Sequence, residues 1–506
     1  MEIINSLFSW FIRKRLNELG QAINNPIETQ SDLLKNLIST ASDTEWGKKY
    51  QYQSVKTSRE FKARVPLQDY ESHKPYIERL MNGENNLLWP SKIKWFSKSS
   101  GTTQDKSKFI PVSAEALEEC HYKGGKDLYA LYYNAYPESQ IFTGKALVMG
   151  GSHKLREVSN ELSYGDISAI LIQNVPWWAN LHRTPDLRIA LMDEWENKIE
   201  QMARQAIQED VSQMVGVPTW TVVLIKKIFE ITGKNDMSEV WPSLELYVHG
   251  GVSFSPYRHL FQELIRSSKM NYWETYNASE GFFGIQDQRD SDELLLLLNN
   301  GIYYEFLPET EIGKDDPQTL SLEDVKTETN YALIISTNAG LWRYNIGDTI
   351  RFTSLDPFRI KITGRTKSFI NAFGEELMVG DAEKALAETC HELRCSVTDF
   401  TAGPVYFSVE GKGAHEWFLE FETEPDDFER FIDLLDEKLT STNSDYEAKR
   451  INDLALQRPV MHKLEPGTFY RWMKQQGKLG GQNKVPRLAN DRKIIEQLNE
   501  FLKSPA

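Results

Sequence analysis

The sequence predicts an α/β fold with more than one domain, and three observations lead to this prediction. The chain has 506 residues, more than a single hydrophobic core usually serves. Between about residues 140 and 350, short apolar runs alternate with longer amphipathic segments, which is the pattern of an α/β sheet. After residue 366 the pattern changes to alternating strands beside one helix, which indicates a small α+β unit.

The helices and strands are expected in a definite order along the chain. Residues 1–90 are predicted to be helical with short loops, and Ser31 is a suitable cap for the helix at 31–38. Buried strands are predicted at 145–151, 221–225, 244–251 and 332–337. Amphipathic helices are predicted at 193–208 and 255–268.

The later segments predict mainly β-structure. Residues 294–308, with Asn-Asn-Gly at their centre, are predicted to form a β-hairpin. In the C-terminal part, paired strands at 405–411 and 416–424 accompany a helix at 426–439. The domain boundary is therefore placed at residue 366, giving domains of 1–366 and 367–506.

Composition limits the classes of partner and the compartment. The net charge of −15 argues against nucleic acid or an anionic membrane as the main partner, and no apolar run is long enough to span a membrane. Cys390 and Cys395, with His391 between them, lack the further ligands of a metal site. We expect reduced, buried thiols and a cytoplasmic protein.

A Ser- and Thr-rich loop, FSKSSGTTQDKSKF at 96–109, raises the question of phosphate binding. Glycine and hydroxyl groups suit an anion-binding backbone, and lysine adds positive charge for phosphate oxygens. The loop lacks the closing Gly-Lys-Ser/Thr of a Walker motif. A solvated surface turn remains the alternative for this stretch alone.

Two further stretches, HGGVSFSPY at 249–257 and TYNASEGFFGI at 275–285, offer groups suited to a nucleotide. Gly250 and Gly251 end an apolar strand, where ligands gather in open α/β sheets, although an ordinary tight strand-to-helix turn is the simpler explanation of this stretch alone. Tyr276 offers a ring for stacking a base, and Glu280 offers a carboxylate for magnesium. A solvated loop acid is the simpler reading of Glu280 taken alone.

The segments GLWRYNIGDTIRF at 340–352 and QNKVPRL at 482–488 contain two more candidates. Asp348 interrupts an alternating apolar segment and could accept both hydroxyls of a ribose, or it could cap a turn. Lys484 lies in a Gly-rich loop near the end of the chain, where most lysines are only solvated.

Taken in order, SSGTT, YNASEG, YNIGD, GRTK and QNKVPR resemble the signatures of the Gretchen Hagen family of acyl-acid amido synthetases. This family belongs to the wider adenylate-forming enzymes, which include the acyl-CoA synthetases and luciferase. The resemblance extends over nearly the whole chain, starting at DTEWGKKY (43–50). It implies the adenylate-forming fold: a large N-terminal α/β domain with a β-barrel-like subregion and a small, mobile C-terminal α+β domain.

The resemblance also implies a role for each matching residue. The phosphate loop would consist of Ser99, Ser100, Gly101, Thr102, Thr103 and Lys108. The residues flanking adenine would be Gly250, Gly251, Tyr276, Asn277 and Ala278. Ser279 would hold the α-phosphate, Glu280 the magnesium, and Asp348 with Arg365 the ribose. Lys484 would be the catalytic lysine, which reaches the nucleotide only if the small domain closes over the large one. Phe282 could line the acyl-acid pocket or could be a core aromatic residue.

The chain departs from the family pattern at two places. Gln104, Asp105 and Lys106 occupy the stretch where the phosphate loop usually has a second glycine, so the path of that loop is open. Asn277-Ala278 replaces the common Gly-Ser beside the adenine.

The function expected from the resemblance is an ATP- and Mg²⁺-dependent ligase. It would adenylate a small carboxylic acid, release pyrophosphate and transfer the acyl group to an amine, most often an amino acid. The alternatives are a thioester-forming acyl-CoA synthetase and a non-catalytic nucleotide-binding protein of the same fold. We expect a monomer or a weak dimer, with no nucleic-acid partner and no insertion into membranes.

Overall fold

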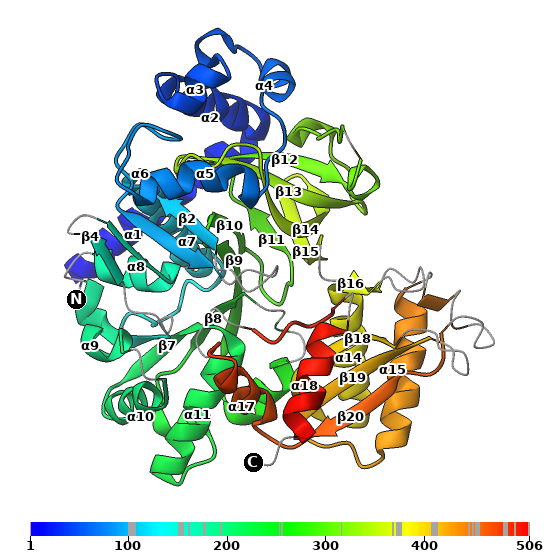
Figure 1. Ribbon diagram of the computed structural model, residues 1–506. Helices are drawn as coiled ribbons and strands as arrows, with labels where there is room; N and C mark the ends of the chain where they lie inside the picture. The colour runs from blue at the N-terminus through cyan, green and yellow to red at the C-terminus, as the bar shows by residue number, and fades with distance from the viewer. Residues whose placement is uncertain are drawn as a thin grey trace.

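The structure of the chain is a computed structural model (Figure 1). The residues it describes are 2–99, 108–149, 156–159, 162–175, 179–192, 195–251, 254, 257–314, 316–366, 369–370, 377–405, 413–443, 446–447, 450, 456–478, 484–489 and 492–503.

The N-terminal ninety residues are mainly helical, as predicted. The helices are α1 (Glu2–Asn24), α2 (Pro26–Thr40), α3 (Glu45–Lys49), η1 (Tyr52–Ser54), α4 (Ser58–Arg64) and α5 (Tyr70–Met81). Ser31 lies inside α2 rather than at its cap, because α2 begins with Pro26, a residue suited to the first helical turn. The cap prediction was wrong, although residues 31–38 are helical as expected.

One mixed sheet of eleven strands forms the centre of the large domain (Figure 1). In spatial order its strands are β12 (Ile302–Pro308), β13 (Asn330–Thr337), β14 (Tyr344–Leu355), β15 (Phe358–Arg365), β11 (Leu294–Leu296), β10 (Gly281–Gln286), β9 (Asn271–Ala278), β8 (Leu246–Gly250), β7 (Val211–Gly216), β3 (Lys145–Val148) and β6 (Arg183–Thr184). Strands β6, β3, β7, β8 and β9 run parallel, whereas the pairs from β9 to β12 are antiparallel.

A second sheet and a set of helices complete the large domain. The second sheet has the order β2 (Lys108–Val112), β1 (Trp95–Ser99), β5 (Leu162–Gly165) and β4 (Arg156–Ser159). The helices are α6 (Ala114–Ala116), the π-helical turn η2 (Leu117–Tyr122), α7 (Lys123–Ala135), α8 (Ile167–Asn174), η3 (Ala179–His182), α9 (Leu187–Ala190), α10 (Trp195–Ala206), α11 (Pro218–Thr232), α12 (Met237–Val240), α13 (Arg258–Leu264), η5 (Glu309–Glu311) and η6 (Leu322–Asp324). Helices α10, α11 and α13 share one hydrophobic core with β7 and β8, while α1 and α7 share another with β8 to β14.

The large sheet curls strongly between β9 and β14. Tyr276 on β9 donates a hydrogen bond of 2.8 Å from its hydroxyl to Oδ2 of Asp348 on β14. Four inter-strand steps separate these strands in the sheet order, which is roughly 19 Å in a flat sheet at about 4.8 Å per step. A tyrosine side chain cannot span that distance, so the two strands must approach each other across the concave face.

The small domain is an α+β unit, as predicted. Its elements are β16 (Phe369–Ile370), β17 (Leu377–Met378), α14 (Val379–Leu393), β18 (Ser396–Val405), β19 (Ala414–Thr423), α15 (Phe428–Thr442), β20 (Val460–Leu464), α17 (Thr468–Gln475) and α18 (Lys493–Lys503). Helices α14 and α15 pack on one core of the sheet β18–β19–β20, and α17 and α18 pack on another. The strand expected at 405–411 lies outside the described residues after Val405.

One strand prediction was wrong, and one strand was missed. The run at 221–225 lies within helix α11, because its apolar pattern continues through Ile228 with helical spacing. A five-residue apolar run does not distinguish a strand from a buried helix segment. The strand of this region is β7, which the predictions did not include.

The hairpin expected at 294–308 is also wrong. Gly301 does adopt φ +79° in the Asn-Asn-Gly turn, but the strands on its two sides pair with different neighbours. Strand β11 pairs with β10 and β15, whereas β12 pairs with β13. The turn sequence thus predicted a reversal of the chain without fixing the pairing.

The cysteines and the helices of the structure bear on the expected compartment and on membrane insertion. Cys120, Cys390 and Cys395 are buried and form no disulfide, as expected. Among the described residues, no helix combines the length and the apolar character needed to cross a bilayer.

A buried ion pair ties the N-terminal helices to the large sheet. Arg343 lies between β13 and β14, and its Nη2 is 2.8 Å from Oε2 of Glu305 on β12. The two side chains are 6% and 1% exposed. The same guanidinium donates to the carbonyl oxygens of Val65 (2.6 Å) and Lys62 (3.0 Å) and to Oγ1 of Thr319 (2.9 Å). The pair therefore connects three parts of the chain that are distant in sequence.

Replacing Arg343 with Met is expected to lower the free energy of unfolding by about 3–5 kcal/mol, because Glu305 would remain buried without its partner. Urea unfolding followed by tryptophan fluorescence measures this change. Arg79→Met is the control, since it breaks only the exposed contacts with Glu45 and Glu84 and should have little effect. Equal effects of the two substitutions would contradict a structural role for the buried pair.

Candidate active site

The end of strand β8 presents backbone without side chains. A Cβ built on Gly250 would lie 2.5 Å from the carbonyl oxygen of Thr275 on β9, so only glycine fits at this position. Gly251 adopts φ +80° and is exposed. Ligands of open α/β sheets bind at the carboxyl ends of strands. Close packing of β8 on β9 therefore requires glycine at position 250, and the backbone conformation favours glycine at position 251.

The turn between β9 and β10 carries the next group of predicted residues. Strand β9 ends at Ala278, and Ser279 and Glu280 form the two-residue turn. Ser279 is buried, and its Oγ accepts a hydrogen bond of 2.8 Å from Ser97 on β1. Asn277 is exposed, while Glu280 is half-buried. The turn is therefore fixed to the second sheet by a contact that brings β1 to the same place.

Tyr276 and Asp348 are joined directly by the hydrogen bond that crosses the curled sheet. Both residues are buried, at 5% and 8% exposure. Arg365 stands opposite Asp348 in the register of β14 and β15. For Arg365 the structure describes the backbone alone. The structure brings together the residues predicted to face the base and the ribose.

The predicted phosphate loop is only partly described. Ser99 ends β1 and Lys108 begins β2, and the two are register partners in an antiparallel pair. The amine of Lys108 lies 5.7 Å from the ring centroid of Tyr70 on α5. Ser100, Gly101, Thr102 and Thr103 lie outside the described residues, as do Gln104, Asp105 and Lys106.

Lys484 of the small domain reaches the end of β8. Its Nζ is 3.2 Å from the position that a Cβ on Gly251 would occupy. In this structure a side chain of the small domain therefore contacts the large domain at the end of β8.

Phe282 lies in the core behind the turn. A Cβ built on Gly124 of α7 would be 2.6 Å from Cγ of Phe282, so the phenyl ring lies directly on the helix backbone. Phe282 is 7% exposed, and its N–H donates to Sγ of Cys120 in the π-helical turn η2 over 3.2 Å. The ring is part of the core, and its proposed contact with an acyl substrate stays a prediction.

The acidic residues around the site do not form a metal cage made of protein alone. Within the described part of the chain, no cluster of three or more His, Cys, Asp or Glu residues is placed to hold a metal ion. Glu280 thus offers a single carboxylate. Mg²⁺ is often bound in this way, through one or two carboxylates together with substrate phosphates and water.

Three residues near the site escaped prediction, namely His249, Ser97 and Thr275. His249 directly precedes the paired glycines, Ser97 lies two residues before Ser99, and Thr275 donates from Oγ1 to the carbonyl oxygen of His249 over 3.2 Å. Their proximity to the motifs was the available signal. What they contact depends on the fold.

His249 is deeply buried. Its ring stacks on Phe254 with centroids 4.0 Å apart, it is 2% exposed, and neither ring nitrogen has a hydrogen-bond partner among the described residues. Burial, reinforced by the charge of Arg258, lowers the pKa of His249 to about 3. The imidazole is consequently neutral at physiological pH.

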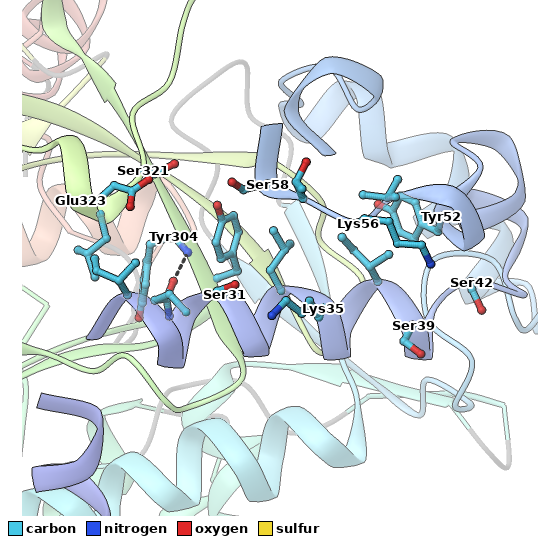
Figure 2. A pocket seen from close by; sticks show the side chains of 18 of the residues that line it. Ser31, Lys35, Ser39, Ser42, Tyr52, Lys56, Ser58, Tyr304, Ser321 and Glu323 are labelled. Atoms are coloured by element: carbon cyan, nitrogen blue, oxygen red, sulfur yellow. Dashed lines mark hydrogen bonds between the residues drawn. The ribbon is translucent and has the colours of Figure 1, made fainter. Parts of the chain in front are cut away.

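A cavity of about 760 Å³ lies elsewhere, between α2, strand β12 and the segment of residues 52–58 (Figure 2). Its walls carry hydroxyl groups, including Ser31, Ser58 and Ser321, together with Lys35 and Lys56. None of the predicted site residues lines this cavity. The predicted nucleotide site and this cavity are distinct places in the large domain.

Comparison with protein families gives three matches along the chain. The sequence model of the GH3 family N-terminal domain matches residues 15–270, that of the GH3 family central domain matches residues 295–365, and that of the GH3 family C-terminal domain matches residues 380–493.

Individual GH3 proteins are similar to this chain over nearly its whole length, at low sequence identity. The indole-3-acetic acid-amido synthetase GH3.3 of Arabidopsis thaliana is 22% identical, over 96% of this chain and 93% of its own. The 4-substituted benzoates-glutamate ligase GH3.12 of Arabidopsis thaliana is 23% identical, over 95% and 96%. The solved AtGH3.15 acyl acid amido synthetase in complex with 2,4-DB has a TM-score of 0.81 at 19% identity, covering 97% of this chain and 96% of its own. A 2-hydroxyisobutyryl-CoA ligase in the postadenylation state has a TM-score of 0.61 at 11% identity, over 95% and 93%.

Replacing His249 with Phe is expected to change how stability depends on pH. Because the native pKa of His249 is lowered, the unfolded state binds more protons below about pH 6.5, and the wild type loses stability as pH falls. The phenyl variant lacks this loss, so its stability relative to the wild type should rise by about 2 kcal/mol between pH 7 and pH 5.

Urea unfolding of both proteins at the two pH values measures this difference, and other titrating groups cancel in the comparison. A difference that stays constant with pH would show that His249 has the same pKa in the folded and unfolded states, so that burial does not lower it.

Proposed function

Because this chain belongs to the GH3 family of acyl acid amido synthetases, we propose that it is an ATP-dependent ligase that joins a small carboxylic acid to an amino acid. The observation that carries the proposal is the meeting of four separate sequence motifs where β8 and β9 end and β14 passes Asp348. The amine of Lys484 lies at Gly251, and Tyr276 is bonded to Asp348.

We assign the nucleotide to the backbone surface of Gly250 and Gly251. Gly250 lets strand β9 approach closely, and Tyr276 with Asn277 and Ala278, on that neighbouring strand, would flank the base. Asp348 would accept the ribose hydroxyls, with Arg365 across the strand pair. The bond from Tyr276 orients the Asp348 carboxylate for this contact.

The phosphates would lie between the two sheets. Ser279, held by Ser97, would contact the α-phosphate, and the loop from Ser99 to Thr103 with Lys108 would enclose the outer phosphates. Lys484 would neutralise charge that develops on the α-phosphate during transfer. These groups supply position and charge, which are the main requirements of phosphoryl-type transfer.

Glu280 fits the role of magnesium ligand. Its single carboxylate, half-buried beside Ser279, matches the habit of Mg²⁺ of binding through few protein oxygens and completing its shell with phosphate and water. When bound, the ion would offset phosphate charge and polarise the phosphoryl oxygens.

The proposed reaction has two steps. The substrate carboxylate attacks the α-phosphorus of ATP, forming an acyl–phosphate anhydride bond as the bond to pyrophosphate breaks. The neutral amine of an amino acid then attacks the acyl carbon, an amide forms, a proton leaves the nitrogen, and AMP departs. Phe282 is proposed to face the acyl group from the core side.

The remaining assignments are also proposals. We place the domain boundary at residue 366, supported by the separate core and sheet that follow Phe369. The β-barrel-like subregion would be the curled part of the sheet between β9 and β14. Three unbonded thiols support a cytosolic location. We propose a monomer or weak dimer.

A screen tests the function. Purified protein is incubated with ATP, Mg²⁺, labelled pyrophosphate and single acids that include benzoate, indole-3-acetate and aliphatic carboxylates. We expect at least one acid to drive exchange of label into ATP, and an amino acid to convert that acid into an amide. Product formation with coenzyme A instead of amino acids would assign a thioester ligase, and no exchange with any acid would contradict the proposal.

Glu280→Gln is expected to keep the fold but to lower acid-dependent exchange by at least about a hundredfold, because the metal loses its protein carboxylate. The melting temperature should change little, since Glu280 lies in a turn. Glu388→Gln, which changes an exposed carboxylate on α14 outside the proposed site in the same way, serves as the control. Exchange close to the wild-type rate in Glu280→Gln would exclude Glu280 as the ligand.

A further inference from the structure

Arg487 joins the two domains three residues after Lys484. Its Nη2 donates a hydrogen bond of 2.8 Å to the hydroxyl of Tyr257 in the large domain. Within the small domain, its Nη1 forms an ion pair with Asp399, and its Nε lies 3.8 Å from Oε1 of Glu383. The guanidinium also lies 4.8 Å from the ring centroid of Phe400.

The charge of Arg487 is balanced inside its own domain. Both carboxylates come from the small domain, on β18 and α14, whereas the Tyr257 hydroxyl is neutral because burial raises its pKa. Separation of the domains would break the bond to Tyr257 and leave the ion pair with Asp399 in place. The contact between the domains can thus open without exposing an unpaired charge.

The segment that carries Lys484 is held firmly at its other end. Thr401 on β18 donates to the carbonyl oxygen of Pro486 over 2.5 Å, and the N–H of Ala402 donates to the carbonyl oxygen of Arg487 over 2.9 Å. Movement of Arg487 relative to Tyr257 therefore moves Lys484 as well.

Tyr257 belongs to the same connection as Gly251. This connection runs from the end of β8 to the start of α13, and Tyr257 is its last residue, 2% exposed in the core of the large domain. Lys484 meets the beginning of the connection at Gly251, and Arg487 meets its end. One short piece of the large domain thus receives both side chains.

We propose that the hydrogen bond between Arg487 and Tyr257 is a latch that holds Lys484 in the nucleotide site and sets the balance between the two half-reactions. Arg487 and Tyr257 are positioning residues, since they act through Lys484. The inference rests on the proposed function, in which the lysine serves activation of the acid and the small domain moves before the amine attacks.

A second contact between the domains reports closure without any substrate. The amine of Lys226 on α11 pairs with the carboxylate of Glu422 on β19. A water-soluble carbodiimide converts such a pair into an amide, which is quantified as a cross-linked peptide by mass spectrometry. Lys463 and Glu424, 2.7 Å apart within the small domain, provide the internal reference.

Tyr257→Phe removes only the hydroxyl that accepts the bond. We expect the Lys226–Glu422 product to fall severalfold while the Lys463–Glu424 product stays constant. Tyr247→Phe is the matched control, because it removes a buried hydroxyl from the same core whose described hydrogen bonds, to Gly216 and Thr221, both lie within the large domain. Arg487→Lys, which keeps the charge but not the forked donors, should behave as Tyr257→Phe does.

The two half-reactions provide the second measurement. The first is followed as pyrophosphate exchange with the acid that is active in the screen, and the second starts from the chemically prepared acyl-adenylate of that acid. Tyr257→Phe should lower pyrophosphate exchange roughly tenfold, the effect of losing one hydrogen bond to a charged group, while conversion of the supplied adenylate into amide stays the same or rises. A purely structural role would lower both rates alike.

The experiments distinguish failure of the latch from failure of the proposed function. An unchanged Lys226–Glu422 product in Tyr257→Phe, or equal loss of both half-reactions, would overturn the latch. Failure of every acid in the screen would overturn the proposed function, while the cross-linking would still decide whether Arg487 and Tyr257 hold the domains together.

Discussion

The hydrogen bond from Tyr276 to Asp348 depends on the curl of the large sheet, and so does the whole candidate site. The residues that would hold base and ribose come from strands that are not neighbours in the sheet order. Curling brings them together on the concave face, and the change from parallel to antiparallel pairing at β9 places the Ser279–Glu280 turn beside them. Since strand twist is intrinsic to L-amino acids, a long mixed sheet supplies much of this geometry without special residues.

The closed position of the small domain adds the last cationic group to a site that is otherwise built by the large domain. The two domains have separate cores, and the described contacts between them include three polar ones: the pairs Lys226–Glu422 and Arg487–Tyr257 and the approach of Lys484 to Gly251. Tyr470 of α17 adds an apolar contact with the core of the large domain. Polar contacts of this kind exchange readily with water, whereas buried apolar surface would hold the domains in one arrangement. A two-step reaction in one site benefits from such an interface.

The sequence allowed prediction of those features that depend on local backbone. The glycines at 250 and 251 were expected to end a strand and Asp348 to interrupt an apolar segment, and the structure has Gly250 at the end of β8 and Asp348 next to Gly347 in β14, where the pairing is irregular. Pairing was not predictable in the same way. The apolar run at 221–225 fits a strand and a helix equally well, and the strands around Gly301 choose partners through the global sheet. The contacts of Ser97 and Arg487 link residues more than 180 positions apart, so no local pattern could reveal them.

The contact between Gly124 and Phe282 has a consequence for redesign of the protein. No side chain can be added at position 124 while the phenyl ring stays where it is, because a Cβ there would fall 2.6 Å from Cγ of the ring. The size of the side chain allowed at position 124 therefore depends on the size of the side chain at position 282. A smaller residue at 282 would open space above α7, and alanine at 124 would reclaim it. Redesign of this part of the core consequently has to change position 124 on α7 and position 282 on β10 together.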